Sequence, residues 1–145
     1  MTTSCTHRRL RGDAPLRILV VDDDHTTRLV VRLIMERRGH EILEAASGPT
    51  ALETLSFERV DLVFLDLDLP EMDGFETARR YRHSMPHHGT APIIALTAHS
   101  SPAEQQKCFD VGMAGLMAKP LNASCVDAVM EMIRSPDMCG DPRHA

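Results

Sequence analysis

The sequence is poor in aromatic residues. It contains no Trp, one Tyr and four Phe, set against nine Met. An interface built from this chain would therefore lack the Trp and Tyr anchors that dominate many binding surfaces. The core has to come from aliphatic residues and Met, and hydrophobic residues make up 43% of the chain. That fraction is ample for a single core.

Two function classes have no support in the composition. The net charge is −5 and no basic stripe is visible, which argues against a nucleic-acid-binding surface. The longest apolar runs hold four or five residues, and a membrane-spanning helix needs roughly 18 or more. We therefore expect neither a nucleic-acid nor a membrane partner.

Cysteines are also few. The chain has four, without Cys-x-x-Cys spacing and without a secretory signal before them. We therefore expect reduced thiols and a cytoplasmic protein. The loop around His83, His87 and His88 has no nearby Cys or acidic partner, so it is a poor candidate for a metal site.

What is present is a regular alternation of short apolar runs and helical patterns. The runs cover residues 16–21, 41–45, 62–66, 93–97 and 115–118. Runs of this length fit buried strands, whereas a helix needs ten or so residues. Apolar residues at helical spacing follow each run and predict five helices. The alternation predicts an α/β fold, a flavodoxin-like, doubly wound, five-stranded parallel sheet in the order 2-1-3-4-5.

Local signals predict where three of the helices begin. Asp73 is expected to cap the helix after the third strand. Ser101 and Glu104 have the spacing of a capping box, with a Pro at the first helical position. Asn122 or Ser124 is expected to cap the last helix.

The length of 145 residues predicts one domain. We expect this domain to cover residues 15–135. A disordered tail over residues 1–14 would precede it, and a polar tail over residues 136–145 would follow it.

Polar residues that could take part in binding or catalysis follow the ends of the predicted strands. Asp22 and Asp23 follow the first strand, Asp66 the third, Thr97 the fourth and Lys119 the fifth. In a parallel sheet these strand ends share one edge, where ligands bind. Carboxylates this close repel by roughly 4 kcal/mol per pair at about 4 Å and an effective dielectric near 20. A divalent cation would relieve that repulsion, and all-oxygen ligands favour Mg²⁺ or Mn²⁺.

Lys119 and Thr97 add a positive charge and a hydroxyl donor to the same edge. Together they suit the oxygens of a tetrahedral anion. A carboxylate can itself accept a phosphoryl group, and phosphoryl transfer depends mainly on positioning and charge neutralisation. The strand ends therefore predict phosphoryl chemistry.

These residues resemble the response regulator receiver domains of two-component signalling. The similarity extends over roughly residues 16–134. The matching motifs are Ile18-Leu-Val-Val-Asp22-Asp23, Asp61-Leu-Val-Phe-Leu-Asp66, Pro70 with Met72-Asp73-Gly74, Ala95-Leu-Thr97-Ala98 and Lys119-Pro120. Each motif alone is weak, but all of them in this order are specific. The stretch from Leu96 to Pro120 looks like the receivers attached to hybrid histidine kinases.

The resemblance implies a role for each site residue. Asp66 would be the phosphoacceptor. Asp22 and Asp23 would hold Mg²⁺, with Asp66 and the backbone carbonyl of Asp68 completing the metal site. Thr97 and Lys119 would bind the phosphoryl oxygens.

The resemblance also implies how the protein would act. It would not be an enzyme with a separate substrate, but an autocatalytic phosphoacceptor that loses its phosphoryl group slowly. The donor would be the phosphohistidine of a sensor histidine kinase or of a histidine phosphotransfer protein. A homodimer would form through the face of the fourth helix, the fifth strand and the fifth helix.

One position departs from the family pattern. Receivers usually carry Tyr or Phe three positions before the Lys, and here that residue is Leu116. The usual coupling between the Thr hydroxyl and an aromatic ring is therefore absent, and we expect phosphorylation to alter the last two helices less than in other receivers. We also expect no output domain, so that the signal leaves through the domain surface or by onward phosphotransfer.

Two alternatives compete with this interpretation. The segment from Phe64 to Asp68 also matches the Asp-x-Asp strand end of haloacid-dehalogenase-type phosphohydrolases, in which the second Asp is a general acid. That family places its first Asp near the start of the fold and a further acidic pair downstream, whereas here the pair precedes Asp66. The other alternative, a degenerate receiver that only binds a partner, conflicts with the intact set of site residues.

Overall fold

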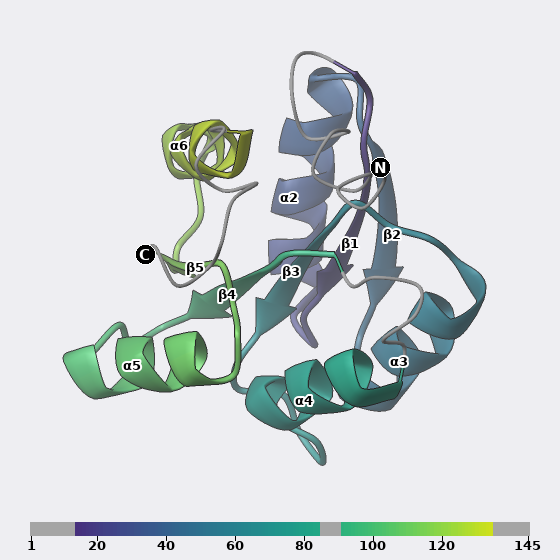
Figure 1. The fold of residues 1–145 in the computed structure, drawn as a ribbon. Helices are drawn as coiled ribbons and strands as arrows, with labels where there is room; N and C mark the ends of the chain where they lie inside the picture. The colour runs from purple at the N-terminus through teal and green to yellow at the C-terminus, as the bar shows by residue number, and fades with distance from the viewer. Residues whose placement is uncertain (1–13, 85–90, 135–145) are drawn as a thin grey trace, which may run out of the picture.

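The computed structural model describes residues 14–84 and 91–134 (Figure 1). Strands and helices alternate along this part of the chain. The strands are β1 (Arg17–Val21), β2 (Glu41–Ala45), β3 (Leu62–Asp66), β4 (Ile93–Thr97) and β5 (Gly115–Ala118). The helices are α2 (His25–Arg37), α3 (Gly48–Phe57), α4 (Gly74–Ser84), α5 (Pro102–Asp110) and α6 (Ala123–Arg134).

All neighbouring strands are parallel, and the sheet order is β2-β1-β3-β4-β5. The predicted fold class, strand order and number of helices are confirmed. The strands lie within a residue of their expected bounds, since β1 begins at Arg17 instead of Leu16. His87, His88 and both predicted tails, apart from Ala14, lie outside the described residues, and His83 lies in the last turn of α4.

Helices cover both faces of the sheet. In Figure 1, α2 and α6 lie on one face, and α3, α4 and α5 lie on the other. Because side chains alternate along a strand, β1 sends Ile18 and Val20 into the cluster under α2 and α6. Leu19 and Val21 enter the cluster under α3, α4 and α5. This division explains why the strands read as nearly continuous apolar runs.

The pairing of neighbouring strands determines where the polar residues at the strand ends lie. Every residue of β3, Asp66 included, is buried. Val21 pairs with Leu65 across β1 and β3, and Thr97 pairs with Ala118 across β4 and β5. The carboxyl ends of these strands are therefore nearly level, and the residues that follow them meet at one edge.

The helix caps follow the local signals. Asp73 Oδ1 accepts a hydrogen bond from Glu76 N at 2.9 Å, as predicted. Of the two candidates for α6, Asn122 acts as the cap, since its Oδ1 accepts from Cys125 N at 2.9 Å. Ser101 Oγ accepts from Glu104 N at 3.2 Å, so α5 also begins where expected.

Two further features of the described chain bear on the sequence predictions. Cys108 and Cys125 are free thiols. Every helix within residues 14–84 and 91–134 is too short or too polar to span a bilayer.

Candidate functional site

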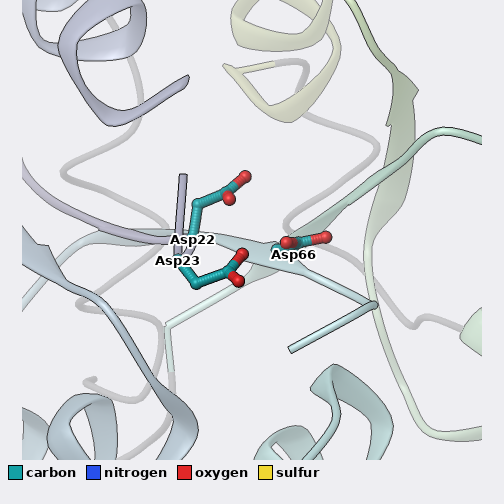
Figure 2. Close-up of side chains that lie close together, drawn as sticks. All are labelled: Asp22, Asp23 and Asp66. Carbon is teal, nitrogen blue, oxygen red and sulfur yellow. The ribbon is translucent and has the colours of Figure 1, made fainter. Parts of the chain in front are cut away.

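Three carboxylates from two strands converge at the carboxyl edge of the sheet. Asp22 and Asp23 come from the end of β1 and Asp66 from the end of β3 (Figure 2). One carboxylate oxygen of each lies within 4.8 Å of the others. Asp22 and Asp66 are buried and Asp23 is exposed, so the cluster is closed on the sheet side and open to solvent on the other. The predicted convergence of these residues is confirmed.

The two buried carboxylates are anchored in the same way. Asp22 Oδ1 accepts a hydrogen bond from Asp24 N at 2.9 Å, and Asp66 Oδ1 accepts from Asp68 N at 3.1 Å. In each case the donor lies two residues further along the chain, where the backbone turns out of the strand. This fixes one oxygen of each carboxylate and leaves the other, Oδ2, for the site.

Lys119 faces both Oδ2 atoms. Its Nζ lies 2.8 Å from Asp22 Oδ2 and 3.4 Å from Asp66 Oδ2. Burial lowers the pKa of Lys119, but the ion pairs with Asp22 and Asp66 outweigh burial and raise it above the ordinary value. The ammonium group therefore stays charged. The sequence prediction that Lys119 joins the acidic strand ends is confirmed by these contacts.

A single ammonium group does not satisfy the cluster. The Lys119 ammonium faces the buried Oδ2 of both Asp22 and Asp66, so one positive charge is shared between two buried carboxylates. Burial, together with the negative charge of Asp22, raises the pKa of Asp66 to about 6, against the lowering effects of Asp68 N–H and Lys119. The excess negative charge of these clustered oxygen ligands is what a small divalent cation would relieve. Asp22, Asp23 and Asp66 thus fit a Mg²⁺-type ion.

Asp68 borders the site through its backbone. Its N–H holds Asp66, while its side chain is exposed. The role of its carbonyl as a metal ligand is not tested by this contact and stays a prediction.

Gly74 supports the site in a way that spacing alone did not reveal. Its N–H donates to Leu67 O at 3.1 Å. A Cβ at this position would lie 2.5 Å from Asp66 O and 2.9 Å from Leu67 Cα. Only glycine lets the start of α4 approach the backbone that carries Asp66 so closely.

Thr97 lies at the predicted strand end, but its hydroxyl is engaged away from the carboxylates. The residue is fully buried. Its Oγ1 lies 2.7 Å from His99 O and 2.7 Å from Glu104 Oε1, and it accepts from His99 N at 2.9 Å. Contact between Thr97 and a phosphoryl oxygen therefore stays a prediction.

Glu104 makes a contact that its spacing from Ser101 did not indicate. In a complete capping box the carboxylate at this position accepts a hydrogen bond from the backbone N–H of the cap residue. Within the described chain its carboxylate instead contacts Thr97. The spacing therefore predicted the start of α5 correctly, but it did not indicate this partner of the Glu104 carboxylate.

Leu116 lies on β5, paired with Ala95 on β4. It is partly buried against the apolar cluster under α3, α4 and α5. The position expected to hold an aromatic switch thus contributes only apolar packing.

Comparisons with known proteins give matches to one family. The family model of the response regulator receiver domain matches residues 18–131. The chain is 36% identical over 106 residues to the sensor protein EvgS of Escherichia coli (strain K12). The matched stretch covers 73% of this chain and 9% of that protein. Several other matches are sensor or hybrid histidine kinases. The chain spans less than half the length of the first curated relatives that it matches.

Two solved structures are similar over almost their whole length. The chemotaxis protein CheY4 of Vibrio cholerae has a TM-score of 0.77 and 30% identity, covering 83% of this chain and 99% of that one. The receiver domain of the sensor histidine kinase PA1611 of Pseudomonas aeruginosa PAO1 has a TM-score of 0.74 and 28% identity, covering 84% and 100%. That structure contains a magnesium ion coordinated in its active site cleft.

Proposed function

This chain belongs to the response regulator receiver domain family of two-component signalling, and from that premise we propose that Asp66 is the residue that accepts the phosphoryl group. The observation that carries the proposal is the contact of Lys119 Nζ with Oδ2 of both Asp66 and Asp22. This contact joins a buried carboxylate, a positive charge and an acidic residue at one edge of the sheet, which are the groups that the proposed reaction needs. The family matches do not support the haloacid dehalogenase alternative.

The proposed reaction is a direct displacement at phosphorus. A carboxylate oxygen of Asp66 forms a bond to phosphorus while the bond from phosphorus to the donor histidine nitrogen breaks, and the electron pair of that bond stays on the nitrogen. The hydrogen bond from Asp68 N to Oδ1 fixes the orientation of the nucleophile. Lys119 then balances negative charge on the phosphoryl oxygens, and Thr97 offers them its hydroxyl proton.

The metal proposed for the site is Mg²⁺. Asp22, Asp23 and Asp66 would hold it, with the carbonyl of Asp68 as the predicted fourth protein ligand. Its support in this chain is the spacing of the three carboxylates and the single ammonium group of Lys119 that Asp22 and Asp66 share. When bound, the ion neutralises charge shared between carboxylate and phosphoryl oxygens.

The partners and the fate of the phosphoryl group follow from the same proposal. The donor is a sensor histidine kinase or a histidine phosphotransfer protein, and the protein turns over no separate substrate. The acyl phosphate is lost by slow self-hydrolysis or by onward transfer. The homodimer through α5, β5 and α6 and the cytoplasmic location stay predictions.

Intact-mass spectrometry tests the central step. Incubation with acetyl phosphate and Mg²⁺ should add the mass of one phosphoryl group to the wild type. Omitting Mg²⁺ should suppress the addition, and Asp66→Asn should abolish it because the amide is a poor nucleophile. Equal labelling of Asp66→Asn would remove Asp66 as the acceptor.

A further inference from the structure

The Thr97 hydroxyl is hydrogen-bonded to Glu104, which is not among the phosphoryl-site residues described above. Glu104 lies in the first turn of α5, and its Oε1 is 2.7 Å from Thr97 Oγ1. We infer that Glu104 is a positioning residue that holds the Thr97 hydroxyl on the α5 side and has to release it when a phosphoryl group binds at Asp66. This inference rests on the proposed function.

The competition follows from the hydrogen-bond capacity of a hydroxyl. Thr97 Oγ1 has one proton to donate, and two acceptors, His99 O and Glu104 Oε1, each lie 2.7 Å away. A carboxylate forms the stronger, charge-assisted bond. The same proton is needed by a phosphoryl oxygen, so the three acceptors exclude one another.

The contacts of Thr97 link the competition for its proton directly to the phosphoryl site. Its carbonyl accepts a hydrogen bond from Lys119 N at 2.8 Å, so the backbone of Thr97 is tied to the residue that pairs with Asp66. The residue is fully buried, which leaves the hydroxyl no water to satisfy it. Rotation of the Thr97 side chain therefore decides whether its hydroxyl proton is donated to Glu104 on α5 or to a phosphoryl oxygen.

Release of Glu104 gives the chain a route for its signal. Its backbone N–H is capped by Ser101 Oγ at 3.2 Å, so the freed carboxylate belongs to the ordered first turn of α5. Leu116 has no ring that could follow Thr97. We therefore place the change caused by phosphorylation at the start of α5 instead of on β5.

Beryllofluoride, a noncovalent mimic of a phosphoryl group on a carboxylate, provides the test. Its affinity in the presence of Mg²⁺ can be measured by amide NMR titration of the whole chain. Glu104→Ala removes the competing acceptor and should tighten binding by about fivefold, the difference between a charge-assisted and a neutral hydrogen bond. Glu104→Asp keeps the charge but is one methylene too short for the contact, so it should tighten binding similarly.

Two controls separate the hydrogen bond from general effects. Asp110→Asn removes a charge at the other end of the same helix, where the carboxylate accepts a hydrogen bond from Gln106 Nε2 at 2.8 Å, and should leave the affinity unchanged. In a Thr97→Ala background, Glu104→Ala should have less than a twofold effect, because no hydroxyl remains to compete for. A merely structural role of Glu104 would give the same effect in both backgrounds.

The outcomes distinguish this inference from the proposed function. If the wild type fails to bind beryllofluoride, the proposed function is wrong. If the wild type binds and Glu104→Ala binds equally well or more weakly, the inference is overturned. It is also overturned if Glu104→Asp behaves like the wild type, since charge alone would then explain the effect.

Discussion

Gly74 offers a direct test of how the fold supports the site. It is the first residue of α4 and packs on the backbone that leaves β3. A Cβ here would lie 2.5 Å from Asp66 O and 2.9 Å from Leu67 Cα. Both are backbone atoms, and Leu67 N is in turn bonded to Leu96 O at 3.0 Å. These atoms cannot swing aside as the end of a side chain can.

Gly74→Ala should therefore destabilise the protein. Overpacking of this kind costs about 1–3 kcal/mol, and the lower entropy of the unfolded chain returns about 0.4–1 kcal/mol. The free energy of unfolding should fall by about 1–2 kcal/mol, which lowers the urea midpoint by roughly 0.5–1 M. Phosphorylation of Asp66 should also slow, because the clash displaces its carbonyl.

Gly115→Ala is the matched control. A Cβ there would meet Met132 Cε at 2.9 Å and Ile94 Cδ1 at 3.2 Å. Met132 is 40% exposed, so its methyl group can move into solvent, and the change in stability should stay within about 0.5 kcal/mol. Equal urea midpoints for Gly74→Ala and Gly115→Ala would refute the reasoning, since the connection between β3 and α4 would then relax freely.

Three further predictions concern the metal, the pH dependence and the reaction class. Asp23→Ala should weaken Mg²⁺ binding in calorimetry and slow phosphorylation, while relief of carboxylate repulsion stabilises the apo fold; an unchanged affinity would contradict the metal site. His40 accepts a hydrogen bond from Leu16 N at 3.0 Å, and burial, with the charges of Arg134 and Arg38, lowers its pKa. As the pH falls, the unfolded state therefore takes up the proton at a higher pH than the folded state. Stability should fall as the pH drops from about 6.5 through the lower pKa of His40 in the folded state. His40→Asn, whose Oδ1 can accept the same hydrogen bond, should lose less stability between pH 7.5 and 5.5 in urea titrations. Asp68→Asn should still be phosphorylated, with an altered acyl phosphate lifetime by mass spectrometry, and the wild type should not turn over phosphate monoesters; rapid turnover that collapses in Asp68→Asn would favour a hydrolase.

The sequence by itself determined the sheet and the residues at its edge. Strand length and helical period are local properties, and they sufficed for the alternation of elements. Parallel pairing then forces the residues after β1, β3 and β5 to one side. Asp22, Asp66 and Lys119 could be brought together on that ground alone, before any distance was known.

Only the tertiary structure decided how individual polar atoms are used. Thr97 and Glu104 are seven residues apart, yet their contact depends on how α5 docks against β4, which spacing does not encode. The Cβ clash at Gly74 and the bond from Leu16 N to His40 likewise depend on distances between separate elements. Hydrogen bonds are short and directional, so shifts of about an ångström between packed elements decide which acceptor a buried donor reaches.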